Sequence, residues 1–129
     1  MSFLLDTVTI IRHFSQQGRI GQGATDALKR IDAGQDSAFI SVISLMEILY
    51  LAERNRITIN FEETLNLIDL SSNYFIVDLT PQILTVARNL EFPELHDRLI
   101  LATAKYLEIP VVSSDQQFKQ IAGISVVWD

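Results

Sequence analysis

Short apolar runs alternate with helical segments along this chain, and that alternation limits the possible folds more than any other feature. Strands that alternate with helices pair in parallel and are covered by helices on both faces. We therefore expect an α/β fold, a three-layer α/β/α sandwich around a central parallel sheet of four to five strands. The runs that predict buried strands are Phe3–Leu5, Ala38–Val42, Tyr74–Val77, Val111–Val112 and, as a fifth, Ser125–Val127.

Helix signals fill the intervals between these runs. Asn60 begins a capping box, Thr80 followed by Pro81 marks a helix start, and Ser44 is the expected N-cap of the helix after the second strand. The predicted helices cover Thr7–Phe14, Ala24–Ile31, Leu45–Arg54, a segment from Asn60 to about Leu70, a segment from Pro81, and Leu95–Leu107.

The length of 129 residues predicts one domain spanning 1–129. The absence of cysteine excludes a disulfide scaffold, a zinc–thiolate site and a thiol nucleophile. The longest uncharged run, Ser37–Met46, is too short to cross a bilayer, and the early charge at Asp6 leaves no room for a signal peptide. We therefore expect a cytoplasmic protein with no membrane partner.

The chain is acidic, with a net charge of −6 and a pI of about 4.8. This charge argues against a protein that holds nucleic acid by general attraction for phosphate. It does not argue against a nuclease, because bound metal ions reverse the local charge of an acidic site. The apolar fraction of 48% is high for so small a chain and indicates an interface with a second copy or a partner.

Four acidic residues are placed where the strands end. Asp6 directly follows the first strand, and Asp115 follows Val111–Val112 after two serines. Glu47 and Asp97 lie in the first turns of helices that begin at the same edge of a parallel sheet. Ligands of such sheets bind beyond the carboxyl ends of the strands, so these carboxylates can converge there.

Converged carboxylates repel one another unless a cation lies between them. Hard divalent ions such as Mg²⁺ and Mn²⁺ prefer oxygen ligands, and they activate water for phosphodiester hydrolysis. The alternative is that Asp6, Asp97 and Asp115 are only helix caps or first-turn acids. Glu47 is harder to explain in that way, because it stands in an apolar stretch where an unpaired carboxylate is costly.

The segments that carry these acids resemble, in order, the four motifs of the PIN-domain family. No single motif is decisive, but together they are fairly specific, and the resemblance covers essentially the whole chain. The segments are Phe3–Thr7, Ile40–Glu47, His96–Ala104 and Ile109–Asp115.

The closest likeness within the family is to VapC-type toxins of bacterial toxin–antitoxin pairs. This resemblance implies an endoribonuclease that depends on Mg²⁺ or Mn²⁺, an RNA substrate, a cognate antitoxin and frequent homodimers. It assigns metal binding and catalysis to Asp6, Glu47, Asp97 and Asp115. It also makes Thr7 and Ser113 hydroxyl groups that orient carboxylates. The chain departs from the family at Val8, where many members carry Asn or Ser.

Three alternatives stay open at this point. A response-regulator receiver would use Asp78, which stands at a strand end shortly before Pro81, as its phospho-acceptor; the paired acids and late lysine of receivers are missing. A haloacid-dehalogenase-type phosphatase would need a second Asp where this chain has Val8. A PIN-like protein could also bind a partner without cutting RNA.

Two residues beside Asp97 have competing interpretations. His96 is either a helix-start residue or a general base or ligand, and the helix-start role is the commoner one. Arg98 is either a phosphate contact or, as we expect, an ion-pair partner of Asp97.

Overall fold

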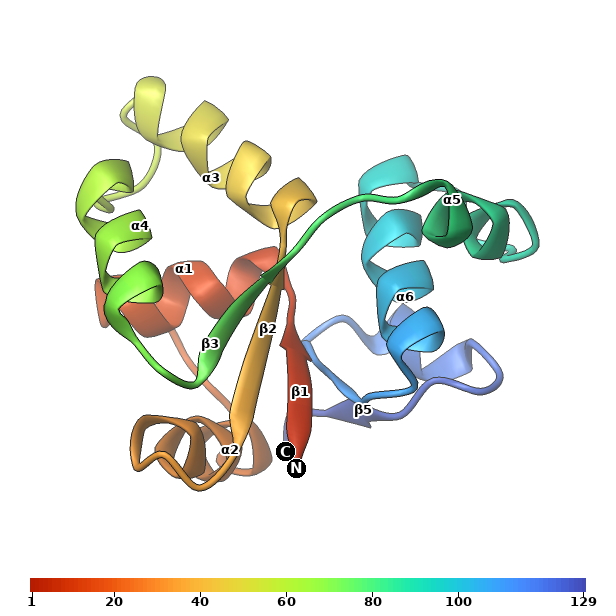
Figure 1. The fold of residues 1–129 in the computed structure, drawn as a ribbon, viewed down its shortest axis with the longest axis horizontal. Helices are drawn as coiled ribbons and strands as arrows, with labels where there is room; N and C mark the ends of the chain where they lie inside the picture. The colour runs from red at the N-terminus through yellow and green to blue at the C-terminus, as the bar shows by residue number, and fades with distance from the viewer.

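A five-stranded parallel sheet forms the centre of the molecule (Figure 1). The computed structural model describes residues 1–129. The strand order is β3-β2-β1-β4-β5, so the first strand of the sequence is the central strand of the sheet. The predicted parallel sheet is confirmed. Its strands are β1 (Ser2–Leu5), β2 (Ser37–Ser41), β3 (Tyr74–Val77), β4 (Val111–Val112) and β5 (Val126–Val127).

Helices connect the strands, and most begin close to the predicted residues. None of them is both long and apolar enough to span a membrane. They are α1 (Thr7–Ser15), α2 (Gln22–Asp32), α3 (Val42–Glu53), α4 (Phe61–Leu70), α5 (Pro81–Arg88), α6 (Leu95–Leu107) and the short 3-10 helix η1 (Gln116–Gln120), which the sequence analysis did not predict.

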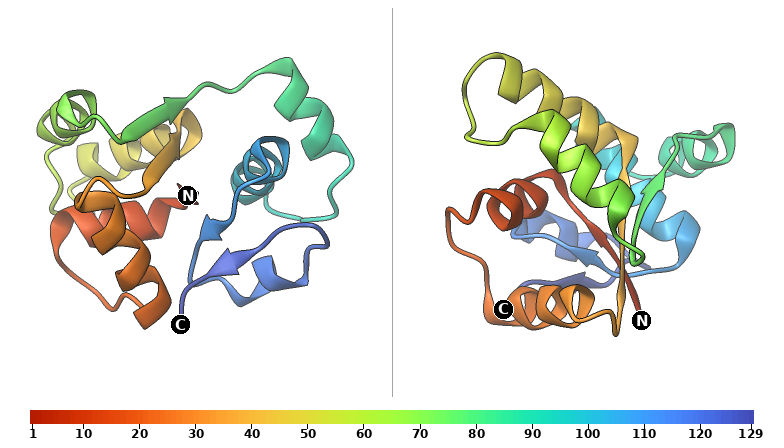
Figure 2. Two further views of the ribbon diagram at one scale, coloured as in Figure 1. Left: turned by 60° about the horizontal axis from the view of Figure 1, so that its bottom comes forward. Right: turned by 60° about the vertical axis from the view of Figure 1, so that its left-hand side comes forward.

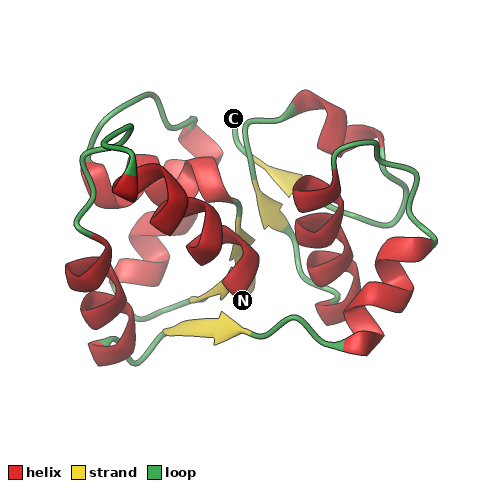
Figure 3. Cartoon of the chain, turned by 90° about the horizontal axis from the view of Figure 1, so that it is seen from above, coloured by secondary structure: helices red, strands yellow, loops and turns green.

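Successive residues of the central strands point to opposite faces of the sheet, as strand geometry requires. Phe3 and Leu5 of β1 enter a buried cluster that is completed by α1, α2, α3 and α4. Leu4 enters a second cluster, which α5, α6 and η1 complete. Figure 3 shows the two groups of helices on either side of the strands. The predicted three-layer α/β/α sandwich is therefore confirmed.

The start of α3 differs from the prediction. The helix begins at Val42, and its N-cap is Ser41, whose hydroxyl accepts a hydrogen bond from the Ile43 amide at 3.1 Å. Ser44 is instead a buried residue inside the first turn. The sequence offered two serines three residues apart, and the earlier one forms the cap because the strand ends directly before the helix.

The two edges of the sheet are treated differently. At the β5 edge, the Ala24 amide at the start of α2 donates to the Trp128 carbonyl at 2.8 Å. A side chain at Gly21 would place its Cβ 2.4 Å from that carbonyl oxygen, so only glycine permits this approach. Trp128 is buried in the core. At the other edge, β3 pairs with β2 alone.

A candidate acidic site at the carboxyl ends of the strands

Asp6 lies at the junction of β1 and α1, beside the end of β4. Its amide donates to the Val112 carbonyl at 3.2 Å, and its side chain caps α1 by accepting from the Thr9 amide at 2.9 Å. The residue is 8% exposed. Burial raises the pKa of Asp6 above its ordinary value, while hydrogen bonds from Ser113 and Thr9 oppose this effect and the charge of Asp115 adds to it.

Asp115 follows β4 and is linked to Asp6 through Ser113. The Asp115 amide donates to the Ser113 hydroxyl at 3.1 Å, and Ser113 also hydrogen bonds to Asp6. The Asp115 carboxylate caps η1 by accepting from the Gln117 amide at 2.8 Å. A carboxylate has two oxygens with about four acceptor positions, so the cap leaves acceptor capacity on Asp115.

Glu47, on the second turn of α3, is held by a hydroxyl from α1. The Thr7 hydroxyl donates to Oε1 of Glu47 at 2.7 Å and lies 2.9 Å from Oγ of Ser44. Thr7 therefore orients a carboxylate of the candidate site, as the sequence predicted. The contact also ties the start of α1 to α3, because Thr7 is the first residue of its helix.

Asp97 lies in the first turn of α6, where the charges of the other acids act on it. Burial is the largest cause that raises its pKa, to about 6, and the second is the charge of Glu94. The charges of Asp115, Glu47 and Asp6 contribute further. The other three acids that the sequence singled out thus lie near enough to influence the carboxyl group of Asp97, although the four come from separate segments.

Glu94 is a fifth acid of this group, and it was not among the acids predicted from the sequence. Its carboxylate caps α6 by accepting from the Asp97 amide at 2.6 Å, and it lies 3.3 Å from Nδ1 of His96. The available signal was the spacing of three residues between an acid and a helical amide, which Asp6 and Thr9 repeat. We call Asp6, Glu47, Glu94, Asp97 and Asp115 the acidic site.

No lysine or arginine forms an ion pair with any residue of the acidic site. The predicted pair between Arg98 and Asp97 does not form, and Nε of Arg98 is buried without a hydrogen-bond partner. No three histidine or acidic side chains lie close enough together to form a ready-made metal cage. The donors are nevertheless hard oxygens, which suit Mg²⁺ or Mn²⁺ held by few carboxylates and several waters.

An apolar hollow of about 360 Å³ borders Glu47. Met46, Tyr50 and Leu51 line it from α3, and His96 lines it from the start of α6. The guanidinium of Arg54 lies 3.6 Å from the centre of the Tyr50 ring. An aromatic side chain, a guanidinium and the acidic site therefore lie in one neighbourhood.

The opposite end of the sheet has an acid in a contrasting environment. Asp36, directly before β2, accepts from Nε of Arg30 at 2.8 Å and from the Met1 ammonium group at 3.1 Å. The hydrogen bond from Arg30 is the largest cause that lowers the pKa of Asp36, and the bond from Met1 is the second. This carboxylate is stabilised by cations of the protein itself.

A model of the PIN domain matches residues 3–124. The chain belongs to the PIN-domain family. The resemblance found in the sequence is thereby confirmed, and PIN domains of the VapC type are nucleases. The receiver alternative fails on topology, because receivers order their strands 2-1-3-4-5 whereas here β3 is an edge strand, so Asp78 follows the edge of the sheet.

Solved structures with this fold include several toxin–antitoxin complexes. A VapBC2 complex from Rickettsia felis, bound to a promoter DNA fragment, has a TM-score of 0.75 at 19% identity, with 100% of each chain covered. DNA-bound VapBC from Salmonella typhimurium has a TM-score of 0.69 at 21% identity, covering 98% of this chain and 96% of the other.

A toxin–antitoxin complex from Klebsiella pneumoniae has a TM-score of 0.65 at 24% identity, covering 94% of this chain and 93% of the other. Among curated proteins, no sequence matches significantly. At these identities the likeness is one of fold, and it agrees with the VapC-type resemblance of the motifs.

Proposed function

We propose that this PIN-domain protein is a divalent-metal-dependent endoribonuclease that acts as the toxin of a toxin–antitoxin pair. The observation that carries the proposal is the acidic site itself, in which the charges of four other carboxylates act on Asp97 and none of the five has a lysine or arginine partner. An arrangement of this kind is unfavourable without a cation. Its position beyond the carboxyl ends of the strands is where ligands of parallel sheets bind.

Asp6, Glu47, Asp97 and Asp115 are the proposed metal-holding and catalytic residues, and Mg²⁺ or Mn²⁺ is the proposed cofactor. When bound, such an ion supplies an activated water and a counter-charge for the scissile phosphate. The protein holds the carboxylates in place through Thr7, whose hydroxyl fixes Glu47, and through the caps formed by Asp6 and Asp115. These contacts use few acceptor positions and leave the others for ligands.

Glu94 has a different proposed role, because it forms the helix cap through the Asp97 amide. The bond fixes the first turn of α6 and hence the position of the Asp97 side chain. Its negative charge also raises the pKa of Asp97, after the larger effect of burial. We therefore assign Glu94 to the positioning of Asp97. His96 lines the hollow beside Glu47, and we assign it to contacts with the substrate.

The hollow beside Glu47 is the proposed binding place for a base next to the scissile phosphate. Single-stranded RNA is recognised mainly through unstacked bases that lie against aromatic rings and guanidinium planes. Tyr50 and Arg54 offer both groups next to the acidic site. This local contact can hold RNA on a protein whose overall charge of −6 gives no general attraction.

The proposed partners are RNA, a cognate antitoxin and a second copy of the chain. The solved structures named above are complexes of toxins with antitoxins, which supports an antitoxin here. Exposed apolar side chains on α3, Met46, Leu49 and Tyr50, provide area for such contacts. A toxin that cuts cellular RNA would act in the cytoplasm, as the sequence predicts.

Cleavage of a labelled structured RNA by the purified chain tests the proposal. We expect cleavage with Mn²⁺ or Mg²⁺ and none with excess chelator, with activity restored when metal is added back. In a host cell, the wild type should arrest growth and Asp97→Asn should not. A folded wild-type protein that leaves RNA intact with either ion would contradict the proposal.

A further inference from the structure

The outer edge of β3 is an unpaired strand edge that carries no lysine, proline or bulge. β3 pairs with β2 on one side only, and Figure 2 shows it at the border of the molecule. Alternate residues of a strand direct their N–H and C=O groups away from the neighbouring strand. No loop, cap or side-chain hydrogen bond involves the backbone of Tyr74–Val77. Half of these backbone groups are therefore available to another chain.

The sequence of β3 favours strand addition. Natural edge strands are commonly blocked by lysine, proline or a bulge, and Tyr74–Val77 contains only aromatic and β-branched residues. Phe75 is 44% exposed and Ile76 is 39% exposed, and Leu70 at the end of α4 is 86% exposed. The edge thus presents apolar side chains together with free hydrogen-bonding groups.

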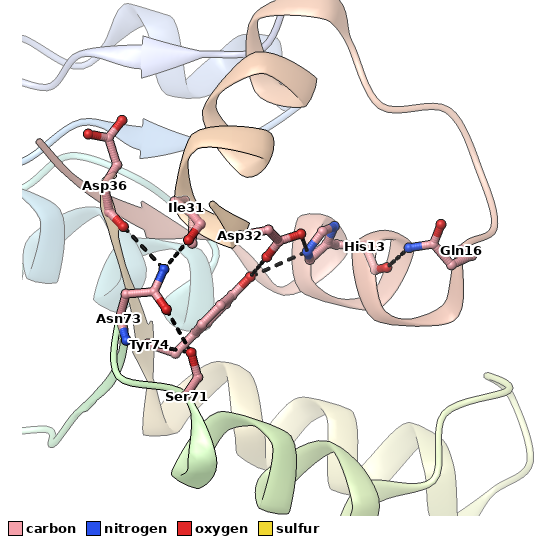
Figure 4. A network of polar contacts seen from close by, with 8 residues as sticks. All are labelled: His13, Gln16, Ile31, Asp32, Asp36, Ser71, Asn73 and Tyr74. Atoms are coloured by element: carbon pink, nitrogen blue, oxygen red, sulfur yellow. Dashed lines mark hydrogen bonds and ion pairs between the residues drawn. The ribbon is translucent and has the colours of Figure 1, made fainter. Parts of the chain in front are cut away.

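Contacts with α1 and α2 fix the position of this strand. Figure 4 shows Asn73 donating to the carbonyls of Ile31 and Asp36, at the start of β3. The Tyr74 hydroxyl donates to Asp32 at 2.7 Å, and Phe75 stacks on a phenylalanine of β2 with 5.3 Å between ring centres. The edge is therefore held ready for pairing before any partner arrives.

The charge around the edge selects the partner. Residues 57–87, which include α4 and β3, contain four acids and no lysine, arginine or histidine. All four acids are exposed. Asp32, the last residue of α2, adds a fifth acid beside Tyr74, and it also lies 3.3 Å from Nε2 of His13. A second copy would bring acids against acids, whereas lysine or arginine side chains would be attracted. The four acids of the segment are Glu62, Glu63, Asp69 and Asp78.

We propose that the β3 edge binds an extended, basic segment of a partner protein, which adds to the sheet as a sixth strand. Backbone hydrogen bonds supply affinity in this mode, and alternating side chains supply specificity. The segment that fits alternates apolar residues, which lie on the Phe75 face of the strand, with lysine or arginine residues on the opposite face, where α4 and its acids lie. The inference is independent of the nuclease proposal, since it concerns another part of the molecule and needs no metal or RNA.

A fluorescent peptide of alternating valine and lysine tests this proposal by anisotropy at physiological salt. We expect binding to the wild type, and at least about tenfold weaker binding of a valine–glutamate peptide. Ile76→Lys should weaken the valine–lysine peptide by a similar factor, while Tyr106→Lys, at a matched exposure on α6, should not. Equal losses in both variants would indicate general charge attraction and overturn the proposal.

Two further measurements guard against ambiguous results. Two versions of the valine–lysine peptide, one methylated at the backbone nitrogens of its valines and one at those of its lysines, should bind with unequal affinity. In an added strand only one of these two sets of N–H groups points toward β3. Equal losses of affinity would overturn strand addition. If Ile76→Lys does not fold, Asp69→Asn combined with Asp78→Asn serves instead and should weaken binding and its salt dependence. Self-association of the wild type that Ile76→Lys abolishes would assign the edge to a second copy and contradict the proposal.

Discussion

Two carboxylates at opposite ends of the sheet show how one fold treats the same chemical group in two ways. Asp36 is paired with Arg30 and the Met1 ammonium group, and its pKa is lowered. Asp97 lies among other acids without a basic partner, and its pKa is raised to about 6. The first arrangement stabilises the folded chain by itself, and the second is unfavourable without a cation between the carboxylates. The difference separates a carboxylate that maintains the fold from the carboxylates that we propose hold a metal ion.

The largest expected effect is on catalysis. Asp97→Asn keeps the shape of the side chain but removes its charge. We expect RNA cleavage to fall by more than about 100-fold, since even residues that only orient a metal ligand commonly cost roughly 10- to 100-fold. Asp36→Asn is the matched control and should keep full activity. Similar losses of cleavage rate in Asp97→Asn and Asp36→Asn would contradict the functional distinction between the two ends of the sheet. Initial rates with excess Mn²⁺ are the measurement.

The second effect is stabilisation by metal. A ligand that binds only the folded state stabilises it by about 2.7 kcal/mol at 100 times its Kd. We expect Mn²⁺ to raise the midpoint of thermal unfolding of the wild type and of Asp36→Asn. Asp97→Asn should respond much less. An equal rise in all three proteins would show that the ion binds outside the acidic site.

A smaller effect on RNA cleavage is expected when the Glu47 carboxylate loses its hydrogen bond from Thr7. Thr7→Val removes the hydroxyl that donates to Glu47 and preserves the side-chain shape. Cleavage should fall by roughly tenfold, at the lower end of the effects of orienting groups on metal sites. Thr7→Ser keeps the donor and should restore most of the rate. A Thr7→Val protein as active as the wild type would show that Glu47 does not need this contact.

The next effect concerns the metal-free protein, whose free energy of unfolding should depend on pH through Asp97. The folded-state pKa of Asp97 is about 6 and its ordinary value is 3.8. Between these values the folded protein binds more protons than the unfolded chain, so the free energy of unfolding falls as pH rises from about 4 to about 7. Asp97→Asn should therefore be more stable than wild type at pH 7, by roughly 1 kcal/mol after solvent screening.

The advantage of Asp97→Asn should disappear below about pH 3, where Asp97 is protonated in both states. Urea unfolding of chelator-treated protein at several pH values measures this difference. A constant difference between the two proteins across the range would count against charge repulsion in the acidic site.

The smallest effect is expected for Asp36→Asn. This substitution should lower the free energy of unfolding at pH 7, whereas Asp97→Asn should raise it. Because the pKa of Asp36 is lowered, its contribution to stability is present above the ordinary value of 3.8 and is lost as pH falls through the folded-state value. Asp36→Asn should be less stable than wild type at pH 7 and equal to it in strong acid. The same urea series measures both acids in one experiment.

Much of this architecture was predictable, because its signals are local. Thr80 and Pro81 start α5 and Asn60 caps α4, as their sequence patterns indicate. Placing Asp6 and Asp115 beyond the strand ends required only the rule that parallel strands share a carboxyl edge. Thr7 was assigned to orient a carboxylate by family resemblance, and the structure identifies that carboxylate as Glu47.

Other features depend on contacts between distant segments and were not predictable. Glu94 caps its own helix through a local signal, but only the packing of α6 places that helix start near Asp6, Glu47 and Asp115. The expected pair of Arg98 with Asp97 rested on their adjacency, but neighbouring residues on a helix point in different directions. The open edge at β3 follows from the strand order, which no single segment encodes.

The central position of β1 has a consequence for the order of events during synthesis. β1 can pair with β2 early, but its other neighbour, β4, ends at Val112, and Asp115 follows it. At roughly 5–20 residues per second, several seconds separate the emergence of Asp6 from that of Asp115. The acidic site therefore comes together only when most of the chain has left the ribosome. A nascent chain that could damage RNA would remain harmless to the ribosome that is producing it.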